Sequence, residues 1–207
     1  MRRSKGFTLI ELLAVIVILS VIMLIAIPSV TGYITSSRKN SFASTGANII
    51  DAVRKYAITA NGLPNYTGDK VVYRVVDENG KIAVKLDSGG TKSAFGAAWM
   101  PGYNYVVIEA TDNNNYNYYY AGYDASGNFI PLTLEDDLKG GVVQNVSELS
   151  DTETIDSKIK KLPTDDSDDS VWADDVDFVD NYNIAISGTA DNVRLYRLYP
   201  NNGDVLL

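Results

Sequence analysis

The feature that most constrains this chain is a single carboxylate, Glu11, inside an apolar run near the N-terminus. Residues 7–27 number 21, and the only ones that are not apolar are Thr8, Glu11 and Ser20. As a helix this run is roughly 31 Å long, at about 1.5 Å per residue, enough to cross a hydrocarbon core of about 30 Å. An acidic group in such a segment is costly, so we interpret Glu11 as a functional residue that has a partner.

A signal peptide and a simple membrane anchor are the two ordinary explanations of the apolar run, and neither accounts for all of its residues. A secretory signal peptide has an apolar region of about 7–15 residues, followed by a small-residue cleavage site. Here residues 12–27 contain one polar member, and no A-x-A site precedes Pro28. A single-span anchor, with the three cationic residues of the first five positions inside the cell, explains the orientation but not Glu11.

The residues that lead into the run form a motif. Lys5-Gly6-Phe7-Thr8-Leu9-Ile10-Glu11 resembles the prepilin processing motif of type IV pilins and pseudopilins, and the resemblance covers residues 1 to about 60. It implies that a prepilin peptidase cleaves between Gly6 and Phe7 and that the new N-terminus of Phe7 is methylated. It also implies that the apolar helix stays on the mature protein, first in the membrane and then in the core of a filament.

The resemblance supplies a partner for Glu11. Cleavage leaves an α-amino group on Phe7, whose ordinary pKa near 7.7–8.0 keeps it largely cationic at neutral pH. A cation and a carboxylate attract more strongly in an apolar bundle than in water, although desolvation offsets much of the gain. We expect Glu11 to pair with the Phe7 amine of a neighbouring subunit. Pairing within one helix is the alternative, because the two residues lie four positions apart.

The helix is expected to continue beyond the apolar run. Pro28 and Gly32 are expected to kink it, because proline removes a backbone hydrogen bond. Beyond them, apolar residues recur at steps of three and four, which predicts an amphipathic helix over residues 33–61 with its apolar stripe on a sheet. The stripe consists of Phe42, Gly46, Ile49, Ile50, Val53, Tyr56, Ala57 and Ala60. Asn61-Gly62 is a stop signal, so residues 7 to about 60 are interpreted as one kinked helix.

After Pro64 the periodicity becomes alternating, which predicts strands. Residues 71–76 and 81–86 flank the turn Asp77-Glu78-Asn79-Gly80 and are predicted to form a hairpin. The other predicted strands are 105–110, a hairpin of 116–123 and 128–132, and a final pair of 182–187 and 193–199, with one or two short helices within 134–163. Six or seven antiparallel strands against one long helix make an α+β head, which agrees with the pilin fold that the N-terminal motif implies.

The expected organisation is therefore a leader at residues 1–6, a hydrophobic transmembrane and filament-core helix at 7–32, and a globular head at 33–207 with its β-sheet in 64–207.

Two clusters in the head suggest binding chemistry. Eight aspartates crowd an acidic loop at 164–180, where calcium is conceivable, but the EF-hand pattern is absent and a solvated loop is favoured. Five tyrosines between 116 and 123 suit a binding face or strand packing, and packing is favoured, with Tyr118 and Tyr120 pointing one way and Tyr119 the other.

Composition removes whole classes of function. Residues 61–207 carry eleven Lys or Arg and 24 Asp or Glu, and such an acidic head argues against nucleic-acid binding. The chain has no histidine and no cysteine, which excludes His-based triads, cysteine nucleophiles and the usual zinc sites. We therefore expect no enzyme activity, no metal and no cofactor. Many Gram-negative type IV pilins carry a disulfide loop, so the lack of cysteine favours a Gram-positive source.

The residues and the resemblance together predict a structural subunit, expected to be the major pilin, of a type IV pilus that serves adhesion, motility or biofilm formation. Its expected partners are other pilin subunits, prepilin peptidase, the pilus assembly machinery and the membrane. We expect it in the cytoplasmic membrane with the head outside before assembly, and in an extracellular filament afterwards. The alternatives are a minor pilin, a pseudopilin of a secretion or DNA-uptake system, and a membrane-anchored adhesin that never polymerises.

Overall fold

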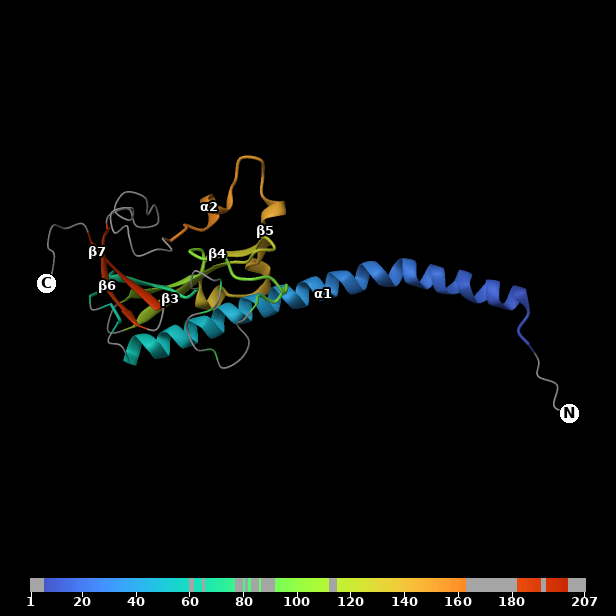
Figure 1. The fold of residues 1–207 in the computed structure, drawn as a ribbon, viewed down its shortest axis with the longest axis horizontal. Coiled ribbons are helices and arrows are strands. Elements are labelled where there is room, and N and C mark those ends of the chain that lie inside the picture. The colour runs from blue at the N-terminus through green and yellow to red at the C-terminus, as the bar shows by residue number, and fades with distance from the viewer. Residues whose placement is uncertain are drawn as a thin grey trace. The chain divides into compact units, whose positions relative to one another are not determined.

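The computed structural model describes residues 6–59, 62–64, 66–76, 80, 82, 86, 92–111 and 115–162, together with the backbone of 182–190 and 193–200. The chain divides into two units, residues 1–38 and residues 39–207. The described part of the first unit is almost entirely helix. The second unit contains the rest of that helix and an antiparallel sheet (Figure 1).

Helix α1 (Leu9–Thr59) is 51 residues long and continues through Pro28 and Gly32 without interruption. The prediction of one helix that reaches to about residue 60 is confirmed, while the kink at Pro28 and Gly32 stays a prediction. At the C-terminal end of α1, the N–H of Gly62 donates to the carbonyl of Ala57 at 2.9 Å. A bond that spans five positions is the 6→1 bond of the Schellman motif, which closes the last turn of a helix, and it accounts for the helix ending before Gly62.

Between residues 39 and 59, α1 buries one face in the second unit. The buried residues are Phe42, Ala43, Gly46, Ile49, Ile50, Val53 and Ala57. The predicted stripe is confirmed, with Ala43 added, Tyr56 only partly buried, and Ala60 outside the described residues. Steps of three and four residues put these side chains on one side of the helix, and each large one contributes roughly 1.5–3 kcal/mol when it is buried.

The sheet pairs its strands antiparallel in the order β5-β4-β3-β2-β1-β7-β6. The strands are β1 (Lys70–Arg74), β2 (Tyr105–Ala110), β3 (Tyr116–Tyr123), β4 (Asn128–Leu134), β5 (Gln144–Asn145), β6 (Tyr182–Ala190) and β7 (Val193–Pro200). The predicted α+β class, the strand at 105–110 and the hairpins β3–β4 and β6–β7 are confirmed. Strand β5 was not predicted, because two residues are too short to show a periodic pattern.

The predicted hairpin of residues 71–76 and 81–86 is only partly correct. An antiparallel bridge joins Val76 to Ile82, and Gly80 has the positive φ, 74°, that a tight turn requires. However, β1 pairs with β2 along one edge and with β7 along the other. Because a strand has only two hydrogen-bonding edges, both edges of β1 are occupied, and residues 81 and 83–85 lie outside the described residues.

Alternation along β3 sends its tyrosines to the two faces of the sheet. Tyr118 and Tyr120 lie in a core cluster with Phe42 and other buried residues of α1. Tyr119 packs on the opposite face, against a second cluster that includes Ile159. The predicted orientation of the three tyrosines is confirmed, and the sheet therefore has an apolar core on each face.

The chain between β4 and residue 162 forms four short helical turns, where one or two were predicted. They are η2 (Glu135–Asp137), η3 (Gly140–Val142), η4 (Val146–Glu148) and α2 (Ile155–Lys158). The last part of this segment places Ile159 and Leu162 in the second core cluster, where both are buried. The predicted acidic loop at 164–180 lies outside the described residues.

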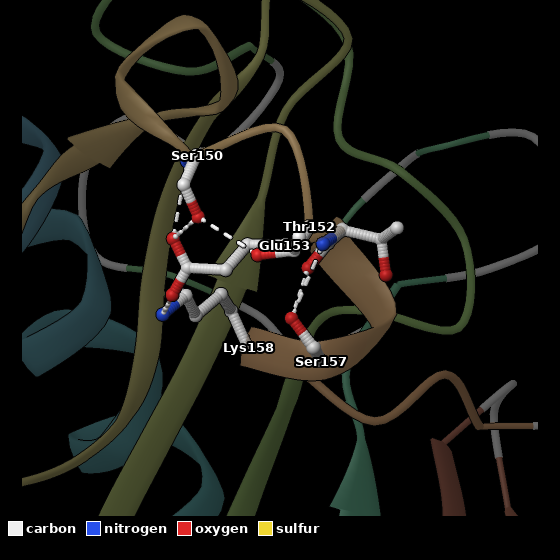
Figure 2. A network of polar contacts seen from close by, with 6 residues as sticks. Ser150, Thr152, Glu153, Ser157 and Lys158 are labelled. Atoms are coloured by element: carbon white, nitrogen blue, oxygen red, sulfur yellow. Dashed lines mark hydrogen bonds and ion pairs between the residues drawn. The ribbon is translucent and has the colours of Figure 1, made fainter.

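A polar network fixes the turn that leads into α2 (Figure 2). The carboxylate of Glu153 forms an ion pair with Lys158 and accepts hydrogen bonds from the backbone N–H and the hydroxyl of Ser150, at 3.1 Å and 2.8 Å. The N–H of Thr154 donates to the hydroxyl of Ser157 at 3.2 Å. The bonds from Lys158 and Ser150 lower the pKa of Glu153 to about 2, because they stabilise its ionised form.

Candidate assembly site at the start of the long helix

The start of α1 is fixed by reciprocal contacts between Thr8 and Glu11. The hydroxyl oxygen Oγ1 of Thr8 accepts a hydrogen bond from the backbone N–H of Glu11 at 3.3 Å. In return, Oε2 of Glu11 accepts from the backbone N–H and from the hydroxyl of Thr8, each at 2.8 Å. This arrangement is a capping box, in which a threonine before the helix and a glutamate at its third position satisfy each other's backbone N–H groups.

The predicted cleavage site lies just before this cap. Helix α1 begins at Leu9, and residues 6–8 form neither helix nor strand. Gly6 is exposed, and the side chain of Phe7 is 93% exposed. The peptide bond between Gly6 and Phe7 is therefore outside the helix and open to solvent, which is what an enzyme that cleaves there would need.

The sequence prediction gave Thr8 no role, although the signal was present. Thr8-x-x-Glu11 directly before an apolar run is the capping-box pattern. The partner of Glu11 within the chain is thus Thr8, and the expected pairing of Glu11 with the Phe7 amine stays a prediction. Among the residues that the structure describes, Thr8 donates to Oε2 of Glu11 and none donates to Oε1.

The apolar part of α1 is exposed along its described length. Every described residue from 6 to 38 is exposed, including Leu9 at 84%, Leu24 at 77% and Ile25 at 71%. Monomeric soluble proteins rarely expose contiguous apolar patches larger than a few hundred Å². By length and composition the helix can cross a membrane. We therefore expect lipid or other apolar helices to cover this surface.

Pro28 and Gly32, the predicted kink residues, both lie within this exposed part of α1. One turn beyond the proline, the hydroxyl of Thr31 donates to the carbonyls of Ile27 at 3.1 Å and Pro28 at 2.9 Å. A Cβ atom built on Gly32 would meet no atom within 4 Å. Packing within this unit therefore does not require glycine at position 32, and a role of both residues in bending stays a prediction.

Two of the β3 tyrosines, Tyr118 and Tyr120, serve packing. Tyr120 is fully buried, and the side chain of Tyr118 is almost so. The guanidinium of Arg54 lies 4.3 Å from the centre of the Tyr118 ring, and its Nη2 donates to Oε2 of Glu135 at 2.5 Å. Burial raises the pKa of the Tyr118 hydroxyl. These contacts connect α1 with β3 and η2, so Tyr118 and Tyr120 are structural residues and not part of an open binding face.

The other candidate site of the head is the acidic loop considered for calcium. Within the part of the chain that the structure describes, no group of three or more potential metal ligands occurs. The eight aspartates considered for calcium lie outside the described residues, so that expectation stays untested. The capped N-terminal end of α1 is consequently the site that the described residues define best.

The N-terminal end of the chain, which includes this site, matches a known protein family. Residues 1–27 match the family described as the prokaryotic N-terminal methylation motif. This is the prepilin-type motif of type IV pilins and pseudopilins, so the resemblance seen in residues 5–11 is confirmed. No solved structure matches the chain. Together with the long apolar helix and the α+β head, the match supports a type IV pilin-like or pseudopilin protein.

The matched N-terminal motif has implications for the processing, assembly and location of the protein. It implies processing by a prepilin peptidase and assembly into pili with other pilins. The apolar helix and the motif are also consistent with membrane anchoring and with a place in a surface pilus. The matched family is a structural motif and not an enzyme family.

Proposed function

We propose that this chain is the major structural subunit of a type IV pilus. A prepilin peptidase removes residues 1–6 by cleaving between Gly6 and Phe7, and Phe7 is then methylated. The apolar part of α1 leaves the membrane and joins a helical bundle that forms the filament core, while the head is displayed for adhesion, motility or biofilm formation. The observation that carries the proposal is an apolar helix, exposed at every described residue up to position 38, that begins behind a capping box at a matched prepilin motif.

The exposed surface of α1 explains how one chain serves in two environments. Lipid tails and the apolar faces of neighbouring helices are alike in polarity, so the same residues suit the membrane and the bundle. Contacts between unlike surfaces of identical subunits extend without closing when the rotation between subunits does not complete a ring. A helical filament follows from such contacts.

Glu11 sets the register between subunits in this proposal. The capping box holds its Oε2 on Thr8, so the carboxylate is oriented before a neighbour arrives and loses less side-chain freedom on pairing. Oε1 then accepts from the methylated Phe7 amine of the neighbouring subunit. Because a charged pair in an apolar bundle is strongly destabilised when one partner is removed, a subunit in the wrong register leaves a charge unpaired and is rejected.

Processing is tested on the protein purified from cells that carry a prepilin peptidase and the pilus machinery. Mass spectrometry is expected to find an N-terminus at Phe7 with one added methyl group. An N-terminus at Met1, or at any residue after 28, would contradict the filament proposal.

The role of Glu11 is tested with Glu11→Ala and Glu11→Gln. The glutamine variant is the matched control for the helix start, because glutamine also completes a capping box but carries no charge. Both variants are expected to be processed normally and to yield far fewer sheared filaments than the wild type. A normal filament yield from Glu11→Gln would show that the charge of Glu11 does not drive assembly.

The position of the chain in the filament separates the major subunit from the alternatives. Immunogold labelling with antibody against the head is expected to be dense along the shaft of surface filaments. Sparse or terminal labelling would indicate a minor pilin. Label confined to the cell envelope, with normal processing, would indicate a pseudopilin, and label on unprocessed chains would indicate a membrane-anchored adhesin.

A further inference from the structure

We propose that before assembly α1 lies in the bilayer with Tyr33 at the outer lipid–water interface and Glu11 at the inner one. Tyr33 and the residues next to it then form a contact surface for the lipid headgroup region. The inference rests on the membrane anchoring in the proposed function, but not on cleavage or filament formation. It places Glu11 at the edge of the hydrocarbon core and not within it.

The distance along the helix supports this placement. Glu11 and Tyr33 are 22 residues apart in an uninterrupted helix. At about 1.5 Å per residue their separation is roughly 33 Å, close to the hydrocarbon thickness of about 30 Å. When Tyr33 lies at one boundary of the core, Glu11 therefore lies at the other, where a carboxylate retains access to water and headgroups.

Two hydroxyl groups within this span, those of Ser20 and Thr31, are compatible with lipid. The hydroxyl of Ser20 donates to the carbonyl of Ile16 at 2.7 Å. Thr31 bonds to its own helix in the same way. A hydroxyl that bonds to its own backbone needs no water, so these residues allow the membrane-embedded part of α1 to extend past position 27.

Tyr33 has the character of an interfacial anchor. Its side chain is 78% exposed, and tyrosine is enriched where a membrane meets water because its ring is apolar and its hydroxyl is polar. Residues 6–37 contain no lysine or arginine, and Arg38, the first cation after that stretch, is exposed. Arg38 lies five positions beyond Tyr33, where it faces the headgroups. Cations in the first five residues stay on the cytoplasmic side.

The competing placement confines the core to the apolar run at 7–27. It puts Glu11 about 6 Å deep in the hydrocarbon and Tyr33 about 9 Å outside it, at about 1.5 Å per residue. The two placements disagree about Val30, which is embedded when Tyr33 is the anchor and outside when the core ends at Ile27. Val30 is thus the position that decides between them.

The chain offers a clean test, because it contains no cysteine. Val30→Cys, Ser37→Cys and Ile22→Cys are made in the full chain and expressed in cells that lack the pilus assembly machinery. Intact cells are treated with a membrane-impermeant maleimide, which reacts with the thiolate and so requires water at the thiol. Ser37→Cys is outside and Ile22→Cys inside in either placement, so they are the positive and negative controls.

The proposed placement predicts that Val30→Cys is labelled several-fold more slowly than Ser37→Cys and resembles Ile22→Cys. Equal labelling at Val30 and Ser37, with Ile22 protected, would overturn the placement and leave the proposed function intact. Labelling at all three positions would overturn the membrane anchoring itself, and with it both proposals.

The anchoring role of Tyr33 is tested in the Val30→Cys chain. Tyr33→Trp keeps an interfacial aromatic residue and is expected to leave the labelling rate unchanged. Tyr33→Asn removes the aromatic ring and is expected to raise the rate several-fold, because the helix loses its fixed depth. Equal rates in the two variants would show that Tyr33 does not set the position of the helix.

Discussion

The two parts of helix α1 have the same secondary structure and opposite surroundings. From residue 39 to residue 59 the helix buries one apolar face against a sheet and keeps polar residues on the other. From Leu9 to residue 38 it is apolar on nearly every side up to Ile27, and all of it is exposed. A helix that is apolar on one face can bury that face against its own domain, whereas a helix that is apolar on all sides is buried only in a bilayer or among other helices.

The largest expected effect compares the same substitution in both parts. Ile50→Ala removes a fully buried side chain from the core and is expected to destabilise the head by about 2–5 kcal/mol. Ile18→Ala, at a side chain that is 59% exposed, is expected to change head stability by less than about 0.5 kcal/mol. Thermal unfolding of the full chain in detergent micelles, followed by near-ultraviolet circular dichroism, measures both. Equal destabilisation would mean that the two parts do not differ as described.

A smaller effect is expected from two glycines of the same helix. A Cβ atom on Gly46 would lie 2.6 Å from Cδ1 of Tyr120, whereas one on Gly32 would meet nothing within 4 Å. Gly32→Ala should gain up to about 1 kcal/mol of helix stability, because alanine is the better helix former. Gly46→Ala has the same gain but adds an overpacking cost of about 1–3 kcal/mol.

Amide hydrogen exchange of peptides that cover each position measures both glycine variants with one readout. Exchange is expected to slow around position 32 and to accelerate around position 46. Slower exchange in Gly46→Ala would show that Tyr120 moves aside without cost, and that α1 and β3 pack less closely than their contacts indicate.

The smallest effect concerns the head alone and depends on pH. Glu153 has its pKa lowered to about 2 by Lys158 and Ser150, from an ordinary value of 4.5. A lowered pKa means that the ionised network stabilises the turn before α2 fully above about pH 4.5, and that this contribution is lost as the pH falls towards 2. A carboxyl carbon NMR titration is expected to show a midpoint near 2. Lys158→Met should raise that midpoint, and an unshifted midpoint in the wild type would mean that the network does not persist in solution.

Local patterns in the sequence predicted much of this molecule. The apolar run, the stripe from Phe42 to Ala57 and the alternating strands each depend on residues that are close in the chain. The helix end before Gly62 and the orientation of Tyr118 and Tyr119 followed from the same local rules. The candidate site was also predictable: the motif around Phe7 was recognised, and the capping role of Thr8 was present in the spacing of Thr8 and Glu11 although it was overlooked.

The pairing of β1 could not be predicted in this way. The hairpin signal at Asn79-Gly80 is genuine, since Gly80 has positive φ and Val76 bridges to Ile82. Yet β1 pairs with β2, and on its other edge with β7, more than a hundred residues further along the chain. Partners so distant are chosen by the packing of the whole sheet, and a local turn signal carries no information about them.

The sequence by itself determined that α1 has two parts, that its N-terminal segment carries a prepilin motif, and that the head has an α+β fold. These properties are local: hydrophobic periodicity, a short motif and turn residues specify them without reference to the rest of the chain. Only the tertiary structure decided which strands flank β1, that the ring of Tyr120 packs directly against Gly46, and that Thr8 engages one oxygen of Glu11. Each of these depends on atoms brought within a few ångströms of one another, and composition and spacing do not fix such distances.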